Sequence, residues 1–165
     1  MSGLADGELN RLAAEAIAAL NERGLTISTA EATTGGLIGH LLTEIPGSSK
    51  VFRGGVAPYA NSFKRRIGVP EDILKEYGAV SREAAEALAI AIRGRGETNV
   101  GLAETGIAGP TGAGPERPAG LFWIAVVDVD GVVSERFLFE SDRAGNRREC
   151  AAAGLRMLLR RLQVR

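Results

Sequence analysis

Leu25–Gly36, LTISTAEATTGG, is the stretch that decides the fold of this chain. Its first half, Leu25–Ala30, is short and rich in β-branched residues, which predicts a buried strand. The glycine pair at its end allows a tight turn, and apolar residues then recur at helical spacing over Leu37–Ile45. The stretch therefore predicts a strand, a turn and a helix in direct succession, which is the building unit of an α/β fold.

The same alternation continues on both sides of this stretch. Helical spacing predicts a first helix over Leu9–Leu20, with Gly24 as the residue that ends it. Further elements are expected as strands over 51–59 and 99–104, and as helices over 62–67, 70–77 and 81–93. The strand over 51–59 is expected at an edge or with a bulge because glycines and a proline interrupt it. Pro70 is expected at the first helical position and Ser81 as a helix cap.

The last third of the chain predicts a hairpin and a helix. Two strongly β-like runs, 121–129 and 132–140, meet at Asp130-Gly131, a pair typical of a tight hairpin turn. A long final helix follows from Asp142. Helices and strands that alternate before a hairpin predict a three-layer α/β/α sandwich with a mixed sheet, in which the hairpin supplies an antiparallel pair.

Composition narrows the class of protein further. A chain of 165 residues with 45% hydrophobic and 24% charged residues predicts one folded domain over 1–165. Twenty basic residues balance twenty acidic ones, which argues against a nucleic-acid-binding domain. We expect a cytoplasmic protein with no membrane partner, because there is no leader-like start and no run of about 18 apolar residues.

The single cysteine and the single histidine limit the possible chemistry. Cys150 has no partner for an internal disulfide or a thiolate zinc site, and His40 alone does not make a metal cluster. We therefore expect no metal and no cofactor. A histidine-based triad would have to use His40.

The turn after the first strand is one candidate site. Thr33 and Thr34 bring hydroxyl groups to the start of a helix, where unsatisfied backbone N–H groups suit an anion or a developing oxyanion. Local chemistry alone favours a simpler interpretation, in which a threonine caps the helix and the glycines ease the turn.

Two further segments and one arginine are candidates. Tyr59 and Lys64 are five residues apart across a strand-to-helix turn, so both can face one pocket, where a buried lysine of lowered pKa can act as a general base. Otherwise Lys64 belongs to a solvated basic run. The glycine-rich segment Thr105–Pro115 can bring backbone amides to a phosphate, or can be a plain surface loop. Arg143, beside Asp142, can hold a phosphate or lie on a solvated face.

Together these segments resemble the C-terminal domain of the competence-damage-inducible CinA proteins, over nearly the whole chain. The family pattern runs A-E-S-C-T-G-G, G-S-S, Y-S-N-x-x-K, G-A-V-S, T-G-I-A-G-P, K-P-x-G and G-D-R-x-x-x-R. Here it reads Ala30–Gly36, Gly47–Ser49, Tyr59–Lys64, Gly78–Ser81, Thr105–Pro110, Arg117–Gly120 and Ser141–Arg143 with Arg147. The family includes amidases that convert nicotinamide mononucleotide to nicotinate mononucleotide and ammonia. The resemblance implies an α/β/α sandwich with a mixed sheet.

The resemblance also implies roles for single residues. In the amidases the serine of A-E-S-C-T-G-G is the proposed nucleophile, and the tyrosine and lysine of Y-S-N-x-x-K activate it. This chain keeps Tyr59 and Lys64 but has Ala32 at the serine position and Thr33 at the next. Carried over position by position, the substrate-binding residues are Glu31, Thr34, Gly35, Gly36, Thr105, Gly106 and Arg143.

Three functional hypotheses follow from this departure. The first is a family member that binds a pyridine-nucleotide-like small molecule but has weak or no amidase activity. The second is an active amidase that uses Thr33, Thr34 or a water activated by Lys64. The third is an assembly or regulatory protein that uses the fold as a binding surface. We also expect the protein to be a homo-oligomer.

Overall fold

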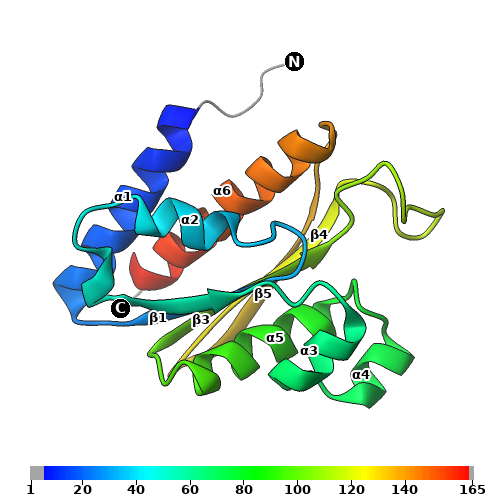
Figure 1. Cartoon of the computed structure of the whole chain (residues 1–165), viewed down its shortest axis with the longest axis horizontal. Helices are drawn as coiled ribbons and strands as arrows, with labels where there is room; N and C mark the ends of the chain where they lie inside the picture. The colour runs from blue at the N-terminus through cyan, green and yellow to red at the C-terminus, as the bar shows by residue number, and fades with distance from the viewer. Residues whose placement is uncertain (1–5, 164–165) are drawn as a thin grey trace.

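One mixed sheet organises residues 6–163, the part of the chain that the computed structural model describes. The two ends of the domain predicted over 1–165, including the start where no leader is expected, lie outside the described residues. The strands lie in the order β2-β1-β3-β4-β5 (Figure 1). They are β1 (Ile27–Glu31), β2 (Phe52–Val56), β3 (Val100–Gly106), β4 (Leu121–Asp128) and β5 (Gly131–Leu138).

Strand directions confirm the mixed sheet. β1 pairs in parallel with β2 and with β3, whereas β3–β4 and β4–β5 are antiparallel. The predicted hairpin is β4–β5, but its turn is Val129-Asp130, one residue earlier than expected. Gly131 pairs with Asp128, and the Asp128 carboxylate accepts the Asp130 N–H at 2.8 Å, which closes the turn one residue early.

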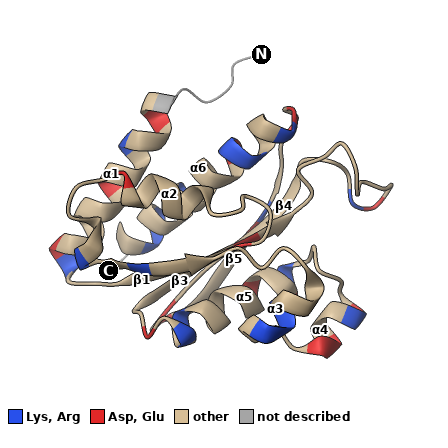
Figure 2. Cartoon of the chain, in the orientation of Figure 1, with Lys and Arg blue, Asp and Glu red and all other residues tan. Residues whose placement is uncertain are grey.

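Helices cover both faces of the sheet, which confirms the three-layer sandwich. α1 (Asp6–Arg23), α2 (Leu37–Thr43) and α6 (Arg143–Gln163) form one layer, and α3 (Asn61–Ile67), α4 (Glu71–Glu76) and α5 (Arg82–Arg95) lie on the other side (Figure 1). A short 3₁₀ turn, Ser48–Lys50, precedes β2. Acidic and basic residues are scattered over both layers (Figure 2).

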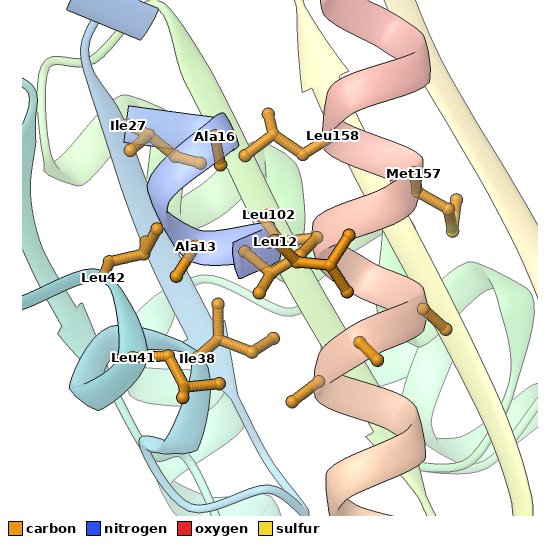
Figure 3. Close-up of a cluster of buried hydrophobic side chains, with 14 of the residues drawn as sticks. Leu12, Ala13, Ala16, Ile27, Ile38, Leu41, Leu42, Leu102, Met157 and Leu158 are labelled. Atoms are coloured by element: carbon orange, nitrogen blue, oxygen red, sulfur yellow. The ribbon is translucent and has the colours of Figure 1, made fainter. Parts of the chain in front are cut away.

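The core has one part on each face of the sheet. The larger part packs α1, α2 and α6 against the sheet through leucines, isoleucines and alanines (Figure 3). Small residues in α6 allow this close approach, since a Cβ on Gly154 would lie 3.3 Å from the Ile38 side chain. The second part lies under α5, and β1 between them is buried along its whole length.

Most element boundaries predicted from the sequence lie within a few residues of those in the structure. Ser81 caps α5 as predicted, because its hydroxyl accepts the Ala84 N–H at 3.1 Å. Pro70 is the residue before α4 rather than its first helical position. β2 is an edge strand with a register irregularity beside Ile27, and it ends at Val56, before Pro58. Within residues 6–163, no helix is both long and apolar enough to cross a membrane.

Candidate functional site

A cavity of about 290 Å³ opens where β1 and β3 end side by side. Five segments that are distant in the sequence contribute to it. The lining residues are Ala32, Thr33, Tyr59, Asn61, Lys64, Ala79, Val80, Thr105, Gly106, Ile107, Ala108, Thr111, Gly112 and Arg143. The structure therefore brings together seven of the residues singled out from the sequence: Ala32, Thr33, Tyr59, Lys64, Thr105, Gly106 and Arg143.

Lys64 is the buried cation of the cavity. It lies in α3, and its side chain points back along the helix so that Nζ donates to the Tyr59 carbonyl oxygen at 3.0 Å. Only 4% of the residue is exposed, whereas Arg65 and Arg66 are exposed, so Lys64 is not part of a solvated basic run. Burial lowers the pKa of the Lys64 ammonium, and the Glu104 carboxylate opposes this shift.

Tyr59 and Arg143 form the outer part of the cavity. Tyr59 is 67% exposed, and Nη2 of Arg143 donates to its phenol oxygen at 3.4 Å. Nη1 of Arg143 donates to the Gly109 carbonyl oxygen at 2.8 Å. Arg143, the first residue of α6, therefore ties the glycine-rich loop to Tyr59 and places a fixed positive charge at the opening.

Ala32 and Thr33 follow β1 directly. The Ala32 N–H donates to the Glu104 carbonyl oxygen at 3.2 Å, which extends the pairing of β1 with β3. The Thr33 hydroxyl donates to the Gly106 carbonyl oxygen at 3.0 Å and accepts the Gly106 N–H at 2.9 Å. Thr33 thus links the two strand ends and uses its only hydroxyl proton in doing so.

The start of α2 corrects an expectation. Two of its first amides are not free for a ligand, because the Glu31 carboxylate accepts the N–H of Ile38 at 2.7 Å and of Gly39 at 2.8 Å. The residue before the helix is Gly36, with φ +99°, and no side chain caps the helix there, so a threonine cap is also wrong. The chain's own glutamate takes the place of the expected anion.

Four residues that were expected to bind the substrate lie outside the lining of the cavity, and their role in binding stays a prediction. Glu31 and Thr34 are 1% and 0% exposed, and they hydrogen-bond to each other at 2.9 Å. Neither of them lines the cavity, and nor do Gly35 and Gly36. These four residues shape the turn that carries Ala32 and Thr33.

Two residues that support this turn were not assigned a role from the sequence. Oε1 of Glu104 accepts the N–H groups of Thr33 and Thr34, each at 2.7 Å, and lies 2.9 Å from the Thr34 hydroxyl. Arg147 donates to the carbonyl oxygens of Thr33 at 3.2 Å and Thr34 at 2.5 Å. Glu104 was detectable as the one acidic residue in an apolar strand run, and Arg147 as the second arginine of the last motif.

Glu104 is also the most perturbed acid of the site. It is fully buried, and its Oε2 has no hydrogen-bond partner within the described part of the chain. Burial raises the pKa of Glu104 from its ordinary value of 4.5 to about 7, although the amides of Thr34 and Thr33 act in the opposite direction. This carboxyl therefore changes charge near neutral pH.

The cavity combines a buried amine, a guanidinium and hydroxyl groups, which suits a small anionic molecule. Between residues 6 and 163, no cluster of three or more His, Cys, Asp or Glu residues is arranged to hold a metal ion.

Comparison with known proteins gives the same family over most of the chain. A family model described as "CinA C-terminal domain" matches residues 9–162. A "CinA-like protein" of Salinibacter ruber is 44% identical over 147 residues, which cover 88% of this chain and 36% of that protein. A "Putative competence-damage inducible protein" of Halothermothrix orenii is 46% identical over 130 residues, 78% of this chain and 32% of that protein. The chain spans about a third of the length of the curated relatives it matches.

A solved structure extends this similarity to the fold. The competence/damage inducible protein CihA of Agrobacterium tumefaciens is 39% identical with a TM-score of 0.92, over 97% of this chain and 98% of that one.

Proposed function

The chain belongs to the CinA C-terminal domain family, and we propose that it binds a pyridine-nucleotide-like molecule in the cavity while hydrolysing amides weakly or not at all. One observation carries this proposal. Ala32 lines the same cavity as Lys64 and Tyr59, at the position where the resemblance implies a serine nucleophile, and alanine has no heteroatom to attack a carbonyl.

The polar groups of the cavity support binding. Lys64 and Arg143 lie on its wall, and a phosphate would make charge-assisted hydrogen bonds with either cation. Thr105 is held in place because its hydroxyl donates to the Ala79 carbonyl oxygen at 2.6 Å. We therefore expect the nucleotide to bind more tightly than its nicotinamide base.

The neighbouring threonines are poor replacements for the serine. The Thr33 hydroxyl is occupied by both backbone groups of Gly106, and Thr34 is fully buried outside the cavity. A water activated by Lys64 is the remaining route to an active amidase, and the experiment below separates it from the proposal.

The test is ammonia release from nicotinamide mononucleotide by native protein and by Ala32→Ser. We expect little release by the native chain and a gain of about a hundredfold from the serine, because Lys64 lines the same cavity and an amine of lowered pKa can accept the serine proton. The double variant Ala32→Ser with Lys64→Met should lose this gain. A matched variant, Thr33→Val in the native chain, should not change the low native rate.

Three outcomes would contradict the proposal. Brisk native turnover that Lys64→Met abolishes would establish an amidase that uses activated water, and brisk turnover that Thr33→Val abolishes would establish a moved nucleophile. Calorimetry that shows no heat with nicotinamide mononucleotide or nicotinate mononucleotide would favour the assembly or regulatory protein instead.

A further inference from the structure

Of the three lysines of this chain, two are exposed and one is buried. Lys50 and Lys75 are exposed, and Lys75 forms an ion pair with Glu71 at 3.2 Å. Lys64 is 4% exposed and lines the cavity. A reagent that enters the cavity therefore meets one lysine, with two solvated lysines in the same chain as internal controls.

Lys64 is buried beside a neutral hydrogen-bond partner rather than in an ion pair. Its hydrogen bond goes to a neutral group, the Tyr59 carbonyl oxygen, and across residues 6–163 it forms no ion pair. Removing an ammonium from water without a paired carboxylate favours the neutral amine. Burial accordingly lowers the pKa of Lys64, against the opposing field of Glu104.

A neutral amine at a cavity wall is a nucleophile. In a serine hydrolase the amine would accept the proton of the serine hydroxyl. Residue 32 is alanine here, so no side-chain hydroxyl at that position can hydrogen-bond to the amine. Carbonyl compounds are the natural electrophiles of such a lysine.

We propose that Lys64 forms an imine with small aldehydes that carry an anionic group. The Nζ lone pair attacks the carbonyl carbon and opens the C=O bond, giving a carbinolamine. The carbinolamine then loses its oxygen as water, with both former Nζ protons, and the C=N bond closes. No oxidant, reductant or metal is needed for this balance.

Arg143 sets the preference for an anionic group. Its guanidinium lines the same cavity and is fixed by Gly109 and Tyr59. An aldehyde with a phosphate can place the phosphate on the guanidinium while its carbonyl carbon lies at Nζ. This inference goes beyond the proposed function, because it requires neither binding nor hydrolysis of a nucleotide.

The experiment labels the full chain with pyridoxal 5′-phosphate at neutral pH, reduces it with borohydride and maps the modified lysines by mass spectrometry. We expect most of the label on Lys64, although Lys50 and Lys75 are far more exposed. Pyridoxal lacks the phosphate and closes to an internal hemiacetal that slows its reaction with every lysine, so the two aldehydes are compared by the ratio of label on Lys64 to label on Lys50 and Lys75. This ratio should be several-fold lower with pyridoxal, and Arg143→Met should lower the ratio for the phosphate compound to that of pyridoxal.

Two results would overturn the inference. Label on Lys50, Lys75 and the N-terminal amine, with Lys64 the least modified, would show that the buried amine is not reactive. An equal ratio of Lys64 label to Lys50 and Lys75 label with the two aldehydes would show that Arg143 confers no preference for an anionic substrate. Both readouts use the native chain, so neither depends on whether a variant folds.

Discussion

The Thr34 hydroxyl lies between two buried carboxyl groups. Its Oγ1 is 2.9 Å from Oε2 of Glu31 and 2.9 Å from Oε1 of Glu104. A hydroxyl has one proton, so Thr34 can donate to only one of the two carboxyl groups at a time. Burial raises the pKa of Glu104 to about 7, and the charge of the nearby Glu31 carboxylate adds to this rise.

Glu104 should make the stability of this protein fall as the pH rises. Between pH 4.5 and about 7 the folded chain binds a proton at Glu104 that the unfolded chain has released, so raising the pH favours unfolding. The full shift corresponds to about 3 kcal/mol. We expect Glu104→Gln to reduce the difference in the free energy of unfolding between pH 4.5 and pH 8, measured by urea denaturation. An unchanged pH dependence in this variant would refute the role of Glu104.

At the scale of single elements, α2 is a helix of seven residues whose first turn is held by a glutamate outside the helix. A helix this short is not stable alone, so its start depends on tertiary partners. Glu31 supplies these partners from the end of β1, and through Thr34 it is linked to Glu104 of β3.

Replacing the Glu31 carboxylate should therefore destabilise the protein. Glu31→Gln retains one acceptor oxygen but loses the second and the charge, so one of the two amides at the start of α2 loses its acceptor. We expect a loss of about 2 kcal/mol in the free energy of unfolding, measured by denaturant titration. Glu22→Gln, at an 81% exposed side chain on α1, is the control and should stay within about 0.5 kcal/mol of the native chain. Equal effects of the two substitutions would contradict this account.

At the scale of the whole molecule, the two edges of the sheet differ. β2 is a short edge strand interrupted by two glycines, whereas β5 is an eight-residue edge strand with the partly exposed Val132, Val133 and Leu138. A long edge strand with exposed apolar residues can pair with another strand. We propose that a second copy of the chain pairs along β5.

Sedimentation tests this proposal directly. We expect the native chain to sediment as an oligomer and Val133→Lys to shift it toward the monomer, because a charge on the edge opposes strand pairing. Val129→Lys places the same charge in the β4–β5 turn, at a 73% exposed residue, and should leave the oligomer intact. A native chain that sediments as a monomer at all concentrations would rule the proposal out.

The order of elements, the sandwich and the segments that meet at the cavity were predictable from the amino-acid sequence. These features depend on local signals: hydrophobic period, glycine and proline at turns, and the Ser81 cap. The convergence of Thr33, Lys64 and Thr105 was also predictable, because the resemblance links the three motifs that carry them.

The pairing of the polar groups, in contrast, became visible only in the folded chain. The amides of Thr33 and Thr34 find their acceptor in Glu104, which is 71 and 70 residues away in the sequence. Likewise, the charged run at Lys64 has no local feature to show that one of its members is buried and the next two are exposed. Hydrophobic period is set by neighbours along the chain, whereas burial and the partner of a charged group are set by segments that approach only when the sheet is assembled.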